Sequence, residues 1–85
     1  MKPLNTPEIH VYSRPGCHLC EELLEALVVV TRDRASIGVR NVDDQEGWRN
    51  EFGDRIPVVV IHGQVVCQHR LDAAAVLRAL AGPAS

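Results

Sequence analysis

One apolar run constrains the fold of this chain more than any other feature: residues 56–61 read IPVVVI. The run shows little alternation between apolar and polar residues, which is typical of a β-strand that is covered on both faces. Pro57 fits this interpretation, because proline is tolerated at the first residue of a strand and poorly tolerated in its interior. The run therefore predicts a core strand with other elements packed against both of its faces.

Periodic patterns place the remaining elements around this strand. Alternation of apolar residues, with many β-branched side chains, predicts strands. Spacing of apolar residues by three and four predicts helices. The dipeptide His62-Gly63 is suited to a two-residue hairpin turn. The expected strands are 8–13, 36–43, 56–61 and 64–68, and the expected helices are 17–32, 45–52 and a last one that runs from Asp72 to the stop signal Gly82-Pro83.

These elements predict an α/β fold of order β-α-β-α-β-β-α, with a four-stranded mixed sheet flanked by helices. The first two strands are joined by a helix and should be parallel, with a right-handed crossover. The last two strands should form an antiparallel hairpin. A chain of 85 residues has room for one domain. We expect residues 1–85 to form it, with residues 1–7 as a flexible lead-in.

The first expected helix presents one apolar stripe to the core. The i, i+3, i+4, i+7, i+8 spacing of such a stripe is followed by Cys20, Leu23, Leu24, Leu27 and Val28. In the strand that follows, Ile37 and Val39 alternate and are expected to share one face.

Short polar residues predict where the other helices begin. Asp43 or Asp44 is expected to cap the second helix, because a side-chain carboxylate can accept from the free N–H groups of the first turn. Within that helix, Trp48 and Phe52 stand at i and i+4 and are expected to pack together. Asp72 is expected to cap the last helix in the same way.

Composition and charge exclude several classes of partner. The 9 Lys+Arg and 11 Asp+Glu residues give a formal net charge of -2, without the basic excess of nucleic-acid-binding proteins. No apolar run approaches the ~18 residues of a membrane span, and the N-terminus lacks the apolar segment of a secretory signal. Three cysteines are too few for a disulfide-stapled secreted scaffold. We expect a cytoplasmic monomer that binds neither nucleic acid nor membranes.

The pair Cys17-His18-Leu19-Cys20 carries the chemistry that the sequence predicts. It follows a strand and a Pro-Gly turn and opens a helix, a setting typical of a thiol–disulfide redox pair. Only the thiolate attacks a disulfide, and the free N–H groups and dipole of a helix start stabilise that anion. Cys17 lies at this end and is the expected nucleophile. Cys20 lies on the apolar stripe and is the expected resolving thiol.

Charged neighbours of this pair are expected to modify its reactivity. Arg14 precedes Cys17 by three residues and adds positive charge. Glu21 and Glu22 follow closely, and carboxylates there would raise a nearby thiol pKa, although exposure to solvent screens the effect. His18 is either a further hydrogen-bond donor to the thiolate or an exposed residue at the helix start.

The motifs together resemble the glutaredoxins, and more closely the short bacterial glutaredoxin-like proteins, whose motif runs Cys-x-Leu-Cys-Glu. The resemblance covers residues 8–81 and is carried by YSRPGCHLCEE, by IPVVV, and by the hairpin and helix that follow. It implies a thioredoxin fold, a cis Pro57 that faces Cys17, and dithiol chemistry through Cys17 and Cys20. It also implies reduction of protein disulfides or of mixed disulfides with glutathione, with no tightly bound cofactor and with glutathione as a candidate reductant.

Glutathione binding in this family implies further site residues. The matching positions are the basic residue Arg14, the backbone of Ile56 before the proline, and Asp72 after the last strand. The family has a diglycine turn ahead of that acid, whereas this chain has the bulky stretch QHRL at 68–71. Glycine permits a close backbone approach that these side chains replace.

The remaining chemistry-bearing residues show no spacing that predicts a site. Cys67 is expected to be a buried structural thiol. The residues His10, His62 and His69 are expected to be solvated or hydrogen-bonded, and Arg32, Arg34 and Arg40 to lie on the solvated surface.

Two other functions are compatible with the sequence. The first is binding of a metal or an iron–sulfur cluster, for which Cys17 and Cys20 would supply two ligands and a second chain or glutathione the rest. The second is a redox-inactive interaction module, because a fold does not determine a function.

Overall fold

The computed structural model describes residues 7–81 and contains four strands, three α-helices and two short 3-10 helices. In chain order they are β1 (Glu8–Ser13), α1 (His18–Thr31), η1 (Arg32–Arg34), β2 (Ser36–Asn41), η2 (Val42–Asp44), α2 (Glu46–Phe52), β3 (Val58–Ile61), β4 (Gln64–Gln68) and α3 (Ala73–Ala81). This confirms the predicted order and the four-stranded mixed sheet.

The sheet has the strand order β2-β1-β3-β4, so β1 and β3 occupy its centre. Strand β1 runs parallel to β2 and antiparallel to β3, and β3 and β4 form an antiparallel hairpin. All four residues of β3 are buried, as expected for a strand that is covered on both faces. The predicted strand over 56–61 is shorter than expected, because its first two residues lie in the preceding loop.

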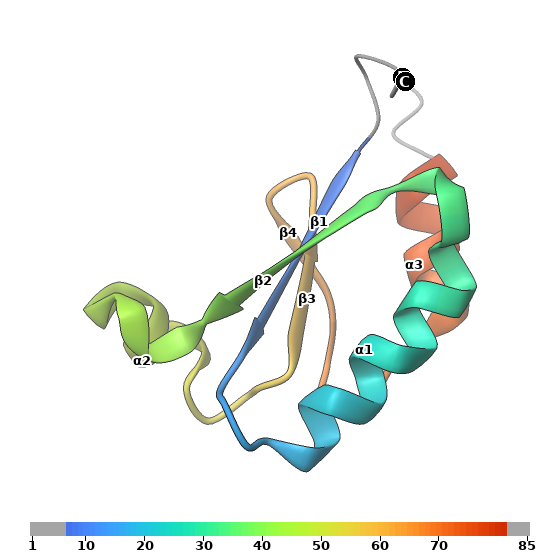
Figure 1. The fold of residues 1–85 in the computed structure, drawn as a ribbon. Coiled ribbons are helices and arrows are strands. Elements are labelled where there is room, and N and C mark those ends of the chain that lie inside the picture. Colours follow the sequence, from blue (N-terminus) through green and yellow to red (C-terminus); the bar gives the residue numbers. More distant parts are fainter. Residues whose placement is uncertain (1–6, 82–85) are drawn as a thin grey trace.

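The two faces of the sheet carry separate hydrophobic clusters. Helices α1 and α3 lie side by side over one face, and α2 lies at the opposite side of the sheet (Figure 1). Beneath α1 and α3, the cluster contains buried residues such as Ile9, Val11 and Leu27. On the other face, Phe52 of α2 packs with Tyr12 of β1 and with Val58 and Val60 of β3.

The buried stripe of α1 differs from the predicted one at its C-terminal end. Its buried residues are Cys20, Leu23, Leu27 and Thr31, whereas Val28 is 57% exposed. The expectation that Val28 lies on the stripe was wrong. An α-helix has 3.6 residues per turn, so a buried stripe through residues 20, 23, 27 and 31 leaves residue 28 toward solvent. The hydroxyl of Thr31 donates to the carbonyl of Leu27, which satisfies it inside the core.

The aromatic residues pack together between α2 and the sheet. Tyr12 lies edge-on to Trp48 at 5.3 Å between ring centroids, and 4.6 Å from Phe52. This confirms the packing role expected of Trp48 and Phe52. Arg40 was expected on the solvated surface, which is wrong: it is half-buried, with its guanidinium carbon 5.5 Å from the Trp48 ring centroid. Its guanidinium lies over the face of the aromatic ring, a cation–π contact.

The segment between β2 and α2 corrects a predicted helix cap. Strand β2 ends at Asn41 rather than at 43, and the side chain of Asn41 caps η2 by accepting from the Asp43 N–H at 2.9 Å. Asp43 and Asp44 therefore lie inside η2, and neither caps α2. That helix begins after Gln45, which makes no side-chain cap hydrogen bond.

The histidines make the contacts expected of non-ligand residues. Nε2 of His10 lies 3.2 Å from both a guanidinium nitrogen of Arg40 and a carboxylate oxygen of Glu8. His62 forms the hairpin turn with Gly63, and both have positive φ, at 53° and 76°. This backbone is that of a type I′ turn, which confirms the predicted hairpin.

Some expectations fall at the chain ends. Pro7 is described, and its carbonyl accepts from the Ser36 N–H at 3.0 Å. The rest of the flexible lead-in expected over 1–7, and the helix stop expected at Gly82 and Pro83, lie outside the described residues. Within residues 7–81, no helix is both long and apolar enough to cross a membrane.

We predict that Leu27→Ala lowers the free energy of unfolding by about 2–5 kcal/mol, because the side chain is fully buried and its loss leaves a cavity. The matched variant Val28→Ala, one position along the same helix, should change it by less than about 0.5 kcal/mol. Urea unfolding of both oxidised proteins measures the difference. Equal losses would contradict the observed orientation of α1.

Candidate functional site

The topology gathers the predicted site residues at one edge of the sheet. Tyr12 of β1 pairs with Val58 of β3, and Val58 pairs with Gln68 of β4. Three segments therefore leave the sheet at the same edge: the loop after β1, the loop before β3 and the loop after β4. The cysteine pair, Pro57 and Asp72 lie in or next to these three segments, which explains how residues far apart in sequence share one site.

A tight turn connects β1 to the cysteine pair. Pro15 and Gly16 occupy its two central positions, Gly16 has φ of 80°, and the Cys17 N–H donates to the Arg14 carbonyl at 3.1 Å. This is the signature of a type II turn, in which proline suits the second position and glycine the third. The turn reverses the chain and delivers Cys17 to the start of α1.

Cys17 is the N-cap residue of α1. Its backbone is extended, with φ of -82° and ψ of 110°, and its Sγ accepts from the Cys20 N–H at 3.2 Å. A sulfur atom thus takes the place that a Ser or Asp oxygen usually holds at a helix start. Because the Cys20 N–H points at this atom and the positive end of the helix dipole lies here, negative charge on it is favoured.

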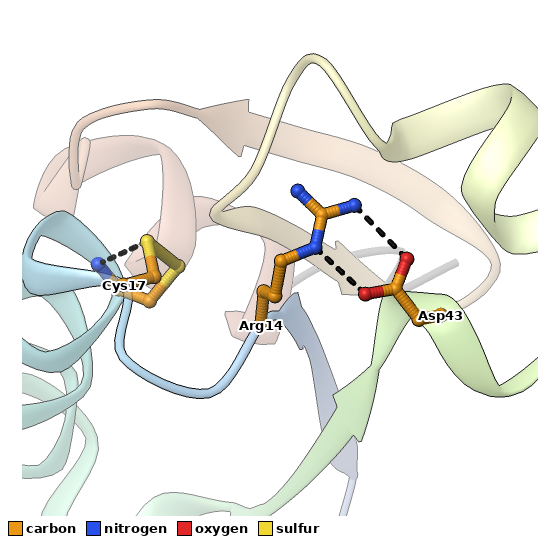
Figure 2. The surroundings of a disulfide bond; sticks show 4 residues. Arg14, Cys17 and Asp43 are labelled. Atoms are coloured by element: carbon orange, nitrogen blue, oxygen red, sulfur yellow. Dashed lines mark hydrogen bonds and ion pairs between the residues drawn. A yellow bond between two sulfur atoms is a disulfide. The ribbon is translucent and has the colours of Figure 1, made fainter.

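The two cysteines form a disulfide, with their Cα atoms 5.2 Å apart (Figure 2). The pair is unequal in exposure: Cys17 is half-buried and Cys20 is 2% exposed. A second disulfide can therefore approach Cys17 from solvent, whereas Cys20 presents almost no surface to it.

Arg14 does not donate to the sulfur atoms. Its side chain extends from the turn toward Asp43 (Figure 2) and binds both carboxylate oxygens, Nε to Oδ2 at 2.8 Å and a terminal nitrogen to Oδ1 at 3.0 Å. This hydrogen bonding holds the pKa of Asp43 below its ordinary value and raises that of Arg14. The positive charge expected next to Cys17 is thus largely balanced by a carboxylate from η2.

His18 lies in the first turn of α1 with its side chain 86% exposed. The contact it makes is with Glu22, whose carboxylate is 3.7 Å from Nε2 and attracts the ring only when the histidine is protonated. Of the two roles considered for His18, this geometry matches the exposed residue at the helix start.

The loop before β3 ends in a cis peptide bond between Ile56 and Pro57. Pro57 is fully buried, and its carbonyl accepts from the His69 N–H at 2.8 Å. Because β3 begins at Val58, the backbone of Ile56 takes part in no strand pairing.

Asp72 caps α3, as predicted. Its Oδ1 accepts from the Ala75 N–H at 3.0 Å and its carbonyl accepts from the Val76 N–H at 3.0 Å. Nearby, Cys67 of β4 is a free, half-buried thiol that packs against the cluster beneath α1. Burial raises the pKa of Cys67, and a backbone hydrogen bond at Asp72 opposes the rise only in part.

A groove of about 390 Å³ opens on the β2 side of α1 and reaches Cys20. Leu24 of α1 and Val39 of β2 form part of its walls. Val39, which was expected to share one face of its strand with Ile37, is 56% exposed and belongs to β2 at the edge of the sheet. Over residues 7–81, the His, Cys, Asp and Glu side chains form no group of three that is arranged to hold a metal ion.

Two features of the site were missed by sequence reasoning. The fork between Arg14 and Asp43 joins residues 29 positions apart, and only the parallel pairing of β1 with β2 brings them together. His69 has φ of 68°, a left-handed conformation that glycine normally supplies. The family's diglycine in this region was a signal for that conformation.

We predict that Arg14→Gln raises the pKa of the Asp43 carboxyl toward its usual value of about 3.8. The carboxyl chemical shift of Asp43 measured against pH by NMR reports this change. Because the folded pKa of Asp43 is lowered, the stabilisation by this pair is complete above the unfolded value and is lost as pH falls through the folded value. Arg14→Gln should therefore destabilise the protein at pH 7 and not at strongly acid pH; a loss independent of pH would refute this account.

Comparison with known proteins assigns the family. The sequence model of the Glutaredoxin-like domain (DUF836) matches residues 8–81. An uncharacterized Mycobacterium tuberculosis protein, Rv0508, is 30% identical over 81 residues, which covers 82% of this chain and 84% of the relative. An uncharacterized Mycobacterium bovis protein, Mb0520, matches equally well.

Two solved structures share the fold. The solution NMR structure of protein Ne2328 from Nitrosomonas europaea superposes with a TM-score of 0.79 at 28% identity, and covers 92% of this chain and 95% of that one. The X-ray structure of the X. campestris protein XcR50 gives a TM-score of 0.69 at 28% identity, with 88% and 99% coverage. The chain has a thioredoxin-like fold, and it belongs to the glutaredoxin-like (DUF836) family.

Proposed function

We propose that this protein is a thiol–disulfide oxidoreductase that reduces protein disulfides or mixed disulfides with glutathione, using Cys17 and Cys20 as a dithiol. The observation that carries the proposal is the cap of α1. A half-buried sulfur accepts a backbone N–H at the helix start and is bonded to a second, buried sulfur one turn along. The family membership, which is typical of thiol oxidoreductases, agrees with it.

The reaction begins from the reduced dithiol. The Cys17 thiolate attacks one sulfur of the substrate disulfide, a mixed disulfide forms, and the other substrate sulfur leaves as a thiolate. Cys20 then loses its proton and attacks the Cys17 sulfur, which releases the second substrate thiolate. Two electrons pass from the dithiol to the substrate, and the Cys17–Cys20 disulfide of the structure is the product. Glutathione or a reductase restores the dithiol.

The geometry supports this order of attack. Cys17 is exposed enough to meet a substrate and lies where the first turn favours an anion, whereas Cys20 is almost fully buried. Glu21 and Glu22 are exposed, so solvent screens their opposing charge. Because Cys20 is almost fully buried and its target is the Cys17 sulfur, its attack follows once Cys17 has captured the substrate.

The residues around the pair have proposed roles in substrate binding. The unpaired backbone of Ile56, ahead of Pro57, offers hydrogen bonds to an extended substrate segment. Arg14 and His18 flank the approach to Cys17 and can contact a substrate carboxylate. Asp72 spends one carboxylate oxygen on the cap of α3, which leaves the other for a ligand. We propose that the protein does this work as a cytoplasmic monomer.

We predict that reduced Cys17 is alkylated by iodoacetamide with a pH midpoint below the ~8.5 of a free thiol. Cys67 should react with a midpoint above its ordinary value, because burial raises its pKa and so lowers its thiolate fraction at any given pH. At pH 7 the rates should differ by at least about ten-fold, the change produced by one pKa unit. Mass spectrometry of the labelled peptides separates the two sites. Equal rates would argue against activation of Cys17.

We predict a second asymmetry between the paired cysteines in the Cys67→Ser background. The variant Cys20→Ser should accumulate one equivalent of a mixed disulfide at Cys17, because no second thiol remains to resolve it. The variant Cys17→Ser should accumulate almost none, because Cys20 is buried. Intact-protein mass spectrometry after exposure to a small aromatic disulfide measures both. Trapping at Cys20 instead would reverse the assigned roles.

A further inference from the structure

A second groove, of about 370 Å³, lies on the Leu19 side of the cysteine motif. Its apolar wall comes from Leu19, Leu23 and Ala26 of α1 and from Leu71 in the loop after β4. Leu19 stands between the two cysteines in sequence and is 53% exposed. A ligand that covers this apolar wall removes apolar surface from water, which favours its binding.

The rim of this groove is charged unevenly. His69 and Arg70, both exposed, stand on the side of the β4–α3 loop, and Glu22 stands on the side of α1. A carboxylate on a ligand would be attracted to Arg70 and repelled by Glu22, which fixes the direction in which the ligand lies.

The basic side of the rim is held in place by its backbone. His69 has φ of 68°, its N–H donates to the Pro57 carbonyl at 2.8 Å, and the Arg70 N–H donates to the Gln68 carbonyl at 2.7 Å. A non-glycine residue keeps this left-handed backbone conformation only where contacts with the surrounding structure hold it there. The rim is therefore tied directly to the proline loop at the substrate edge of the sheet.

We propose that this groove binds the polypeptide of a protein disulfide substrate, with an apolar side chain next to the reacting cysteine on the leucine wall and a neighbouring carboxylate on Arg70. The inference rests on the proposed function and names its substrate class. Glutathione, γ-glutamyl-cysteinyl-glycine, has a carboxylate for Arg70 but no apolar side chain for Leu19 and Leu71. Leu19 is thus the residue that favours a polypeptide over glutathione, and Arg70 is the residue that selects among polypeptides by charge.

The test measures single turnovers of the pre-reduced protein with peptides whose only cysteine carries nitrothiobenzoate in a mixed disulfide. Attack on the peptide sulfur releases nitrothiobenzoate, whose colour reports the rate, and Cys20 then releases the peptide thiol. Three peptide types place Leu and Glu, Leu and Lys, or Gly and Glu on the two sides of the cysteine, in both orders; glutathionyl nitrothiobenzoate is the fourth probe. Each rate is divided by that of the same probe with dithiothreitol.

We expect the Leu/Glu peptide to react at least about three-fold faster than the Leu/Lys peptide, the size of one exposed charge pair. The variant Arg70→Glu should invert this ratio, whereas Arg34→Glu, with the same change of charge at the far end of α1, should keep it. The variant Leu19→Ser should reduce the advantage of Leu/Glu over Gly/Glu by at least about two-fold. Val29→Ser, an exposed change on the same helix, should not.

Two results would overturn the inference alone: a charge ratio that is the same in Arg70→Glu and Arg34→Glu, or a faster reaction with the glutathione probe than with the Leu/Glu peptide. In both cases the protein would still release nitrothiobenzoate through Cys17, and the proposed function would stand. Failure to react with any probe, after alkylation has confirmed a free Cys17 thiol, would overturn the proposed function and the inference together.

Discussion

The antiparallel pairing of β1 with β3 is the constraint on which the site depends. It sets Tyr12 opposite Val58, so the chain leaves β1 toward the cysteines at the same edge where it enters β3 from Pro57. The parallel pairing of β1 with β2 brings Asp43 to that edge, and the hairpin brings His69. Because β1 and β3 at the centre of the sheet are largely buried, the segments around the disulfide are anchored to the core.

The cap of α1 serves the fold and the chemistry with one contact. A helix start needs an acceptor for its free N–H groups, and the chain supplies a sulfur where a hydroxyl or a carboxylate is usual. The Pro-Gly turn delivers that sulfur, and Leu23 and Leu27 anchor the helix behind it. Arg14 contributes less than its position suggests, because its guanidinium is shared with Asp43. Backbone groups therefore contribute most of the electrostatic stabilisation of negative charge at Cys17.

Local patterns predicted most of this structure, and long-range pairing accounts for what they missed. The strands, the hairpin at His62-Gly63, the Asp72 cap and the cysteine pair at a helix start all follow from neighbours within a few residues. The pairing of Asp43 with Arg14 and the packing of Arg40 on Trp48 depend on how β2 and α2 meet the sheet, which no local pattern encodes. In sequence, a carboxylate before a helix looks like an N-cap. In this fold Asp43 pairs instead with Arg14, which is distant in sequence.

The sulfur cap of α1 also couples the oxidation state of the protein to its stability. The first turn of α1 stabilises an anion on Cys17. By reciprocity, that anion stabilises the first turn by the same free energy. Reduction thus replaces a covalent bond across the first turn with an ionic interaction. The helix start therefore need not loosen when the disulfide opens. The same linkage stabilises the reduced form relative to a dithiol without such a cap, and a stabilised reduced form makes a pair more oxidising.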